Sequence, residues 1–420
     1  MNYEHSQGRA HGPTRPPRGD ESTGEAGSTH EATFASADAL LAGRSRLPAV
    51  GTTIFTVMSA LAVKHGAINL GQGFPDFDCD PALVDAVAQA MREGHNQYPP
   101  MTGVPALRQA VATKIERQVG RRYDPDTEIT ITAGATQGIL SAVLALVHPG
   151  DEAIVLEPCY DSYGPAIELA GGRIVRAGLG LSTWRPDFAA LARALTPRTR
   201  LVIVNTPHNP SGTVWTPEER ARFAELLRPT QALVLSDEVY EHMVFDGVAH
   251  VSCAGLAELA ERSIVVSSFG KTFHVTGWKV GYVAAPAALM REFRKVHQFN
   301  VFTVNTPMQH GLARFLADDS HWQSLAAFYE AKRDRFRDGL AATKLKLLPC
   351  EGTYFQCVDY SAISDQPDTA FAEWLTTDLG VAAIPMSAFY ETAPEMRVVR
   401  FCFAKKEETL AAALERLHQL

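Results

Sequence analysis

The residues of this chain that could do chemistry follow short apolar runs. Lys271 comes soon after the run Ser263–Val266, and Asp237 comes soon after Ala232–Leu235. A lysine amine can form an imine with a carbonyl compound and can later move a proton. A carboxylate beside a ring nitrogen can keep that nitrogen protonated. This pair of residues therefore suits covalent catalysis through an imine.

Other small, polar or aromatic residues stand at the ends of further apolar runs. They are Gly134 after Glu128–Thr132, Tyr160 after Ala153–Glu157, Asn209 after Leu201–Val204, and Tyr240 after Asp237. Ligands of open α/β sheets bind beyond the carboxyl ends of the strands, so we expect these residues to meet at one sheet edge. An amide and a hydroxyl can hold a phenolic oxygen, an aromatic ring can cover a planar ligand, and free N–H groups at a helix start suit a phosphate. With Lys271 and Asp237, these are the groups that pyridoxal 5'-phosphate requires, a cofactor whose ring accepts electrons from a carbanion.

The elements that must position these residues alternate regularly from Leu47 onward. The expected strands are Glu128–Thr132, Ala153–Glu157, Arg173–Ala177, Leu201–Asn205, Ala232–Ser236, Ser263–Ser267 and Val280–Ala284. Helical segments lie between them, namely Gly134–Val147, Ser162–Ala170, Asp187–Ala194, Pro217–Leu227 and Ala254–Glu261. Apolar strands separated by helices indicate βαβ units. We predict an α/β fold with a mostly parallel sheet that carries helices on both faces.

The pattern changes after Ala285. A long helix from about Trp322 to Thr343 precedes strands around Leu345–Leu348, Gly352–Asp359 and Met396–Phe403 and a last helix over Glu407–Leu420, which indicates a smaller α+β domain. The first residues are rich in Gly, Pro, Ser and Thr and poor in large apolar residues, a composition typical of disorder. The predicted organisation is a disordered tail over residues 1–45, an arm that belongs partly to the small domain over 46–75, a large cofactor-binding domain over 76–310 and a C-terminal small domain over 311–420.

Composition excludes several classes of partner. The 39 Lys and Arg against 47 Asp and Glu give a net charge of -8, which offers no electrostatic footprint for nucleic acid. The longest apolar stretches are far too short to span a membrane. The six cysteines are scattered without a CxxC pair or a Cys/His cluster, so neither a disulfide framework nor a metal site is indicated. We expect no metal, no nucleic-acid partner, no membrane association and a cytoplasmic location.

Five ordered motifs resemble class I aminotransferases of fold type I, the aspartate-aminotransferase fold, and in particular the branch of the kynurenine and methionine aminotransferases. They are LGQGFPDF at 70–77, NTPHNP at 205–210, SDEVYEHMVFDG at 236–247, SSFGKTFHVTGWKVGY at 267–282 and VVRFCFAKKEETL at 398–410. The resemblance runs from about Leu47 to Leu420. It implies a pyridoxal-phosphate enzyme built of a large domain and a smaller α+β domain.

The resemblance also implies roles for the residues around the cofactor. Lys271 is the Schiff-base lysine, Asp237 pairs with the pyridine nitrogen, and Tyr240 and Asn209 contact the phenolic oxygen. Tyr160 stacks on the ring. The phosphate is held at the start of a helix by Gly134, Ala135, Thr136, Ser268 and Lys279. Lys279 departs from distant relatives, which have Arg there, so a point charge replaces a planar fork.

For the substrate, the resemblance implies that Arg400 binds the α-carboxylate through a two-pronged ion pair. Asn209 and the backbone of Gly73 assist, and Phe55 on the N-terminal arm lines the side-chain pocket. Tyr98 matches the tyrosine that reaches the phosphate of the neighbouring subunit, which implies a homodimer with shared sites.

The predicted activity is transfer of the amino group of methionine, or of a large neutral or aromatic amino acid, to a 2-oxo acid. Two other enzyme activities stay open: a β-lyase that cleaves C–S bonds in cysteine conjugates, and an aminotransferase for dicarboxylates or other class I substrates. A ligand-sensing regulator of the same fold would need a DNA-binding module, and the N-terminal region has neither a winged-helix pattern nor a basic patch.

Overall fold

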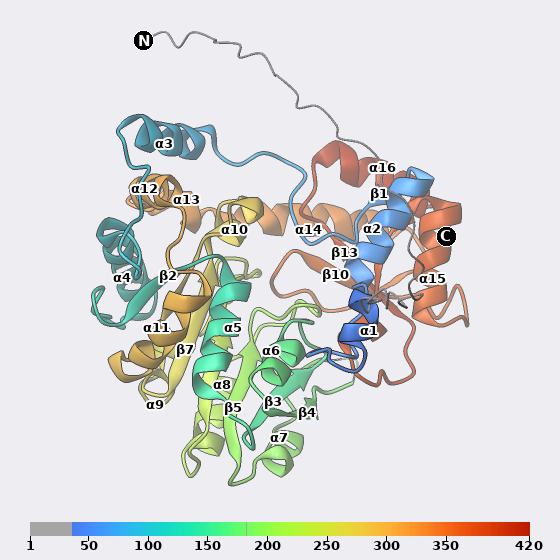
Figure 1. The fold of residues 1–420 in the computed structure, drawn as a ribbon. Coiled ribbons are helices and arrows are strands. Elements are labelled where there is room, and N and C mark those ends of the chain that lie inside the picture. Colours follow the sequence, from blue (N-terminus) through green and yellow to red (C-terminus); the bar gives the residue numbers. More distant parts are fainter. Residues whose placement is uncertain (1–35, 182) are drawn as a thin grey trace, which may run out of the picture. The chain divides into compact units, whose positions relative to one another are not determined.

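The computed structural model describes residues 36–181 and 183–420 (Figure 1). The chain divides into two units, residues 1–45 and 46–420. In the first unit, Ala37–Leu41 forms a helical turn, α1, whose start is capped by the Ser36 hydroxyl. The predicted disorder of the tail falls largely on residues 1–35, which lie outside the described residues.

A seven-stranded sheet forms the centre of the second unit. Its strands are β2 (Ile129–Thr132), β3 (Glu152–Glu157), β4 (Arg173–Gly178), β5 (Thr199–Asn205), β6 (Leu233–Asp237), β7 (Ser263–Ser268) and β8 (Gly281–Ala284). The order is β2-β8-β7-β6-β5-β3-β4, with β2 and β4 at opposite edges (Figure 1). Strand β8 is antiparallel to both of its neighbours and the other pairings are parallel. The predicted strands and the mostly parallel sheet are thus confirmed.

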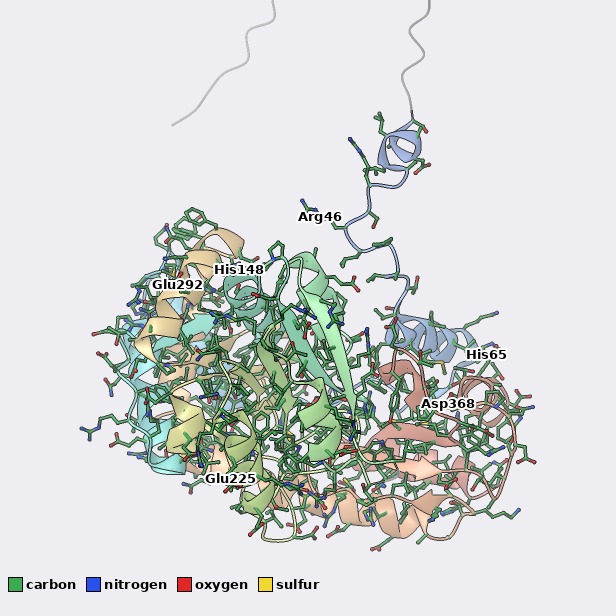
Figure 2. All side chains as sticks on the ribbon, turned by 90° about the horizontal axis from the view of Figure 1, so that it is seen from below. Arg46, His65, His148, Glu225, Glu292 and Asp368 are labelled. Carbon is green, nitrogen blue, oxygen red and sulfur yellow. The ribbon has the colours of Figure 1, made fainter. Side chains whose placement is uncertain are left out.

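Helices cover both faces of this sheet because successive residues of each strand point to opposite sides. On β5, Leu201 and Ile203 pack with residues of α5 (Ala135–Leu146), α6 (Tyr163–Leu169) and α11 (Ala287–Asn300). Val202 and Val204 of the same strand pack with residues of α7 (Phe188–Ala194) and α8 (Pro217–Leu227). Exposed side chains such as Glu225 on α8 and His148 after α5 lie outside these layers (Figure 2). The prediction of two covered faces is confirmed.

The C-terminal part forms a second, antiparallel sheet in the order β12-β13-β10-β9. Its strands are β9 (Lys346–Leu347), β10 (Phe355–Asp359), β12 (Ile384–Pro385) and β13 (Val398–Cys402), and its helices include α14 (Leu325–Leu340), α15 (Asp368–Trp374) and α16 (Glu407–Leu417). The arm joins this part: α2 (Ile54–His65) lies beside it, and β1 (Ile68–Asn69) pairs with β11 (Val381–Ala382) (Figure 1). Segments from the two ends of the second unit therefore fold together.

Two predicted helices differ from the structure. The helix expected from Trp322 to Thr343 is divided into α13 (Ser320–Gln323) and α14, with Ser324 between them. The Ser324 hydroxyl donates to the carbonyl of Ser320, a local bond that competes with the regular helix pattern. The helix expected over Ala254–Glu261 is only a short turn at α9 (Ala257–Ala260). The remaining helices are α3 (Pro81–Arg92), α4 (Pro105–Val119), α10 (Phe269–Thr272) and α12 (Thr306–Phe315).

A buried ionic network ties α4 to the strands that carry the site. The Lys114 ammonium lies 2.8 Å from a carboxylate oxygen of Glu241 and 3.0 Å from the hydroxyl oxygen of Tyr282. The hydroxyls of Ser267 on β7 and Tyr282 on β8 donate to the same Glu241 oxygen at 2.6 and 2.9 Å. Although burial opposes ionisation, the attraction of Lys114 holds the pKa of Glu241 below its usual range. The network therefore joins α4, β7 and β8 to the segment that follows β6.

We predict that Glu241→Gln lowers the free energy of unfolding by about 3–5 kcal/mol, because it leaves the Lys114 ammonium buried without its anion. Urea denaturation followed by circular dichroism measures this loss. The double variant Lys114→Met/Glu241→Gln removes both charges and should recover part of the stability. Equal losses in the single and double variants would show that the charge pair does not determine the effect.

Candidate active site

A pocket of about 750 Å³, part of it open to solvent, lies at the carboxyl ends of β5, β6 and β7. Asn205, Asp237 and Ser268, the last residues of these three strands, line it. The predicted cofactor-binding residues that line it are Gly134, Ala135, Thr136, Tyr160, Asn209, Asp237, Tyr240, Ser268, Lys271 and Lys279. The structure thus brings together in one pocket all of these residues, which the sequence places far apart.

Asp237 is a buried carboxylate held by neutral donors. The Tyr163 hydroxyl donates to its Oδ2 at 2.6 Å, and the backbone N–H of Val239 donates to its Oδ1 at 3.3 Å. Burial raises the pKa of Asp237 to about 6, although the bond from Tyr163 opposes this shift. A buried charge is stabilised best by an opposite charge. The site therefore favours a cationic ligand atom, such as a protonated ring nitrogen, beside Asp237.

The Lys271 amine lies in the same pocket, on α10 just beyond β7. Its Nζ donates to the hydroxyl oxygen of Tyr354 at 2.7 Å and to the carbonyl oxygen of Gly73 at 3.1 Å. Burial lowers the pKa of Lys271 to about 8. A large share of the amine is therefore neutral in mildly alkaline solution, and only the neutral form attacks a carbonyl carbon.

The start of α5 offers a place for a phosphate. Gly134 precedes this helix with φ at +78°, and no side chain caps the helix among the described residues. A Cβ on Gly134 would lie 3.4 Å from Nζ of Lys279, so this ammonium lies over the helix start. A Cβ on Gly281 would lie 3.2 Å from the backbone nitrogen of Ala135, so a glycine is needed for β8 to pass this close. Free N–H groups and a cation together suit a phosphate.

A chain of hydrogen bonds links this cofactor end to Arg400. The Asn205 amide donates to the carbonyl oxygen of Asp237 at 2.9 Å, and the backbone N–H of Asn209 donates to Oδ1 of Asn205 at 2.7 Å. Arg400 then donates from Nη1 to Oδ1 of Asn209 at 2.5 Å. Asn209 therefore lines the pocket and also accepts a hydrogen bond from the guanidinium group.

Arg400 on β13 is a buried cation surrounded by aromatic rings. Its guanidinium carbon lies 3.8 Å from the ring centre of Phe355, 4.8 Å from that of Phe389 and 5.6 Å from that of Phe55. Its Nε has no hydrogen-bond partner among the described residues. Burial lowers the pKa of Arg400. These features suit a carboxylate supplied by a ligand.

The remaining predicted site residues lie as follows. A Cβ on Gly73 would lie 2.9 Å from the Phe355 ring, so glycine is required for its carbonyl to approach Lys271. Tyr240 is buried, with its ring edge-on to that of Tyr354 at 5.2 Å. Tyr98 does not line this pocket: its side chain is 80% exposed and its ring contacts Phe302.

Sequence reasoning missed several residues that contact predicted site residues, among them Asn205, Tyr163 and Tyr354. Asn205 ends β5 within the NTPHNP motif, so its position at a strand end could have identified it. Tyr163 lies three residues after Tyr160, in the first turn of α6, a weaker signal. Tyr354 comes from the C-terminal part, where the rule for strand ends of parallel sheets does not apply.

The site fits pyridoxal phosphate at each end of the pocket. Asp237 suits a protonated pyridine nitrogen, Lys271 suits the aldehyde carbon, and the start of α5 with Lys279 suits the phosphate. The pocket volume also lies in the range of about 300–1,000 Å³ that is usual for sites of small ligands.

Comparisons with known proteins agree with this fit. The chain matches the model of the family described as aminotransferase class I and II over residues 65–417. It is 52% identical over 378 residues to a methionine aminotransferase of Escherichia coli (strain K12), covering 90% of this chain and 98% of that protein. It is 34% identical over 407 residues to kynurenine–oxoglutarate transaminase 1 of Mus musculus, covering 89% of this chain and 96% of that protein.

Structural comparison gives the same result. One similar crystal structure is that of a protein from Escherichia coli, for which structure and reactivity identify a methionine aminotransferase function. It superposes with a TM-score of 0.88 at 52% identity. The superposition covers 90% of this chain and 99% of that chain. The chain therefore belongs to the class I and II aminotransferases, and it is a transaminase of the aspartate-aminotransferase-like fold type I whose cofactor is pyridoxal 5'-phosphate.

Proposed function

We propose that this transaminase moves the amino group of methionine, or of a large neutral or aromatic amino acid, to a 2-oxo acid. The observation that carries the proposal is Arg400, a buried cation enclosed by Phe55, Phe355 and Phe389. An α-carboxylate pairs with the guanidinium, and an apolar side chain packs on the rings. The similarity to the methionine aminotransferase of Escherichia coli supports the same substrate class.

A dicarboxylate substrate would need a second cation for its distal carboxylate. The cations that line the pocket among the described residues are Lys271 and Lys279. Both are committed to the cofactor in this proposal, because Lys271 carries it and Lys279 holds its phosphate. The pocket thus favours a neutral side chain over an acidic one.

Each proposed site residue has a distinct task in the reaction. The bound cofactor supplies an electron sink for the carbanion that forms when the α-proton leaves. Asp237 holds a proton on the ring nitrogen, and Tyr240 and Asn209 orient the phenolic oxygen. The amine of Lys271, once free, would take the α-proton and deliver it to the aldehyde carbon of the cofactor. Tyr160 covers the ring, and Gly134, Ala135, Thr136 and Ser268 hold the phosphate with Lys279.

The substrate is held by a separate group of residues. Arg400 and Asn209 bind the α-carboxylate, the backbone of Gly73 assists, and Phe55 lines the side-chain pocket. Phe55 lies edge-on to Phe389 with ring centres 5.9 Å apart, and both rings lie near the Arg400 guanidinium. Such a wall suits the thioether of methionine, since sulfur contacts aromatic edges favourably.

We also propose that the protein is a homodimer in which Tyr98 reaches the phosphate in the partner's site. Several aromatic residues support a contact surface here. The ring centres of Tyr98 and Phe302 lie 5.3 Å apart, and Phe299, three residues before Phe302, is 87% exposed. Large exposed aromatic residues are enriched where proteins associate.

The proposed domains are an arm over residues 46–75, a large domain over 76–310 and a small domain over 311–420. The pairing of β1 with β11 supports a link between the arm and the small domain.

We also propose a cytoplasmic location, which the six free cysteines suit. Within the described part of the chain, no helix has both the length and the apolar character needed to cross a bilayer.

The activity is tested by mixing the purified protein with methionine and a panel of 2-oxo acids and measuring the keto acid formed from methionine. We expect turnover with methionine and with large neutral or aromatic amino acids, and little with aspartate.

Lys271→Ala should lose turnover by a factor of about 10⁴ or more, because the covalent nucleophile and the proton acceptor are both removed. Retained turnover in this variant would refute the role of Lys271, and release of pyruvate from a cysteine conjugate without any oxo acid would identify a β-lyase instead.

Cofactor affinity should depend on the ionisation of Asp237. Its pKa of about 6 means that the carboxylate is ionised above pH 6 and protonated below it, so affinity for pyridoxal phosphate should fall as pH drops from 7 to 5. Tyr163→Phe removes a bond that favours the ionised form, so the fall should begin at higher pH and the dissociation constant at pH 7 should rise by about tenfold. Fluorescence titration measures these constants.

Asp237→Asn is the matched control for this prediction, since it keeps the shape and abolishes the titration. Any pH dependence that persists in it belongs to other titrating groups, such as the Lys271 amine or the cofactor itself. Identical pH profiles for Tyr163→Phe and the wild type would show that the Tyr163 bond does not tune Asp237.

The shared site is tested at two positions. Phe299→Asp should shift the protein from dimer to monomer in size-exclusion chromatography with light scattering, because it places a charge in an apolar contact. Tyr98→Phe should leave the dimer intact and should release bound cofactor faster, because it removes only a hydroxyl. Val63→Asp, which changes an 83% exposed residue on α2, is the control and should alter neither property. A dimer that survives Phe299→Asp would place the interface elsewhere.

A further inference from the structure

Three polar atoms from distant segments form a triangle at the Lys271 amine. The Nζ of Lys271 lies 2.7 Å from the hydroxyl oxygen of Tyr354 and 3.1 Å from the carbonyl oxygen of Gly73. The Tyr354 hydroxyl itself lies 2.5 Å from the same carbonyl oxygen. Tyr354 is thus the one side chain among the described residues to which the Lys271 amine donates a hydrogen bond.

The number of protons fixes the direction of each bond. A tyrosine hydroxyl has one proton, and the carbonyl of Gly73 can only accept, so Tyr354 donates to Gly73. Its oxygen is then left to accept from Lys271. A neutral amine has two N–H groups and one lone pair. When both N–H groups donate, to Tyr354 and to Gly73, the lone pair is the only direction left free.

Both acceptors of the Lys271 amine are held rigidly. Tyr354 is fully buried, and its ring packs edge-on against Tyr240 at 5.2 Å and Phe355 at 4.9 Å. The backbone around Gly73 is held by Lys405, whose ammonium donates to the carbonyl oxygens of the residues on either side, Gln72 at 3.3 Å and Phe74 at 2.8 Å. Neither acceptor can therefore turn away from the amine without disturbing its packing.

We propose that Tyr354 is a positioning residue which, with the carbonyl of Gly73, holds the free amine of Lys271 so that its lone pair faces the pocket and takes the α-proton of the substrate. The inference rests on the role proposed above for Lys271. During proton removal, the bond between the α-carbon and its hydrogen breaks, a third N–H bond forms on Lys271, and the electron pair stays on the substrate side. The two existing N–H bonds keep their acceptors throughout, so the amine needs no reorientation.

Tyr354→Phe is the informative variant, because it keeps the buried ring and removes only the hydroxyl, which accepts from Lys271 and donates to Gly73. Tyr329→Phe is a matched control in the same aromatic cluster. The Tyr329 ring lies 5.7 Å from that of Tyr354, and its buried hydroxyl has no hydrogen-bond partner among the described residues. The groups that also act on the charge of Lys271 are left unchanged by both variants; they are Cys402, Arg400, Asp237 and Lys279.

The first measurement follows Lys271 directly, in full-length enzyme loaded with pyridoxamine phosphate, the form in which this amine is free. The rate of its acetylation by acetic anhydride, measured by mass spectrometry from pH 6 to 10, gives its titration midpoint. The hydroxyl oxygen accepts from the ammonium more strongly than from the neutral amine, so Tyr354→Phe should shift the midpoint to lower pH. Tyr329→Phe should titrate like the wild type.

The second measurement separates positioning from substrate binding. In Tyr354→Phe we expect kcat for methionine to fall by about tenfold to a hundredfold while KM stays within about threefold, because the base is misplaced and the carboxylate site is intact. The isotope effect with methionine deuterated at the α-carbon should rise, since proton removal becomes slower relative to the other steps. Tyr329→Phe should change neither.

The proposal is overturned if Tyr354→Phe matches Tyr329→Phe both in the titration of Lys271 and in the isotope effect. Failure of the proposed function gives a different result: the wild type would not turn over methionine, or Lys271→Ala would keep turnover. The labelling experiment requires no turnover, so a shifted midpoint in Tyr354→Phe supports the contact even if methionine is not the substrate.

Discussion

The burial of the Asp237 carboxylate is the constraint on which the rest of the site depends. A charge at the end of a central strand, out of contact with bulk water, is costly unless other groups stabilise it. The chain supplies two neutral donors to this carboxylate, the Tyr163 hydroxyl and the Val239 N–H. These donors stabilise the ionised form only in part, since the pKa of Asp237 is still raised to about 6. The charge of Lys271 also lowers this pKa only in part, and the protonated ring of the cofactor would supply a further cation in the proposed site. The need for a ligand is thus built into the strand end itself.

Arg400 presents the same situation with the opposite sign. It is buried, it bonds to an amide oxygen of Asn209, and aromatic rings occupy the space around it. Aromatic rings attract a cation more weakly than a carboxylate does, so the substrate carboxylate proposed to bind here would stabilise the Arg400 guanidinium more than the rings do. The two buried charges are joined through Asn209 and Asn205, so the cofactor end and the substrate end have a fixed spacing. Recognition of an amino acid therefore follows from where the two charges are buried.

Much of this arrangement could be predicted because parallel strands deliver their carboxyl ends to one edge. That rule placed Asp237, Lys271 and Asn209 in one pocket, and the pocket contains all three. Phe55 and Arg400 were identified by resemblance alone, since no local pattern brings β13 or the arm to this edge. Tyr354 could not be predicted, because its position depends on how the antiparallel C-terminal sheet packs on the parallel one. The break at Ser324 was missed because a side-chain bond overrode the helical pattern.

The buried network behind the site explains how the pocket keeps its shape. Its members stand next to site residues in the sequence: Ser267 precedes Ser268, and Glu241 follows Tyr240. In an extended strand such neighbours point to opposite sides, so on β7 one hydroxyl faces the pocket region and the next is bonded to the Glu241 carboxylate. The ion pair of Lys114 with Glu241 then holds these segments from the far side of the sheet. The residues of the buried network and the residues of the pocket are thus neighbours on the same backbone segments. A displacement of the network residues would therefore displace the pocket residues as well.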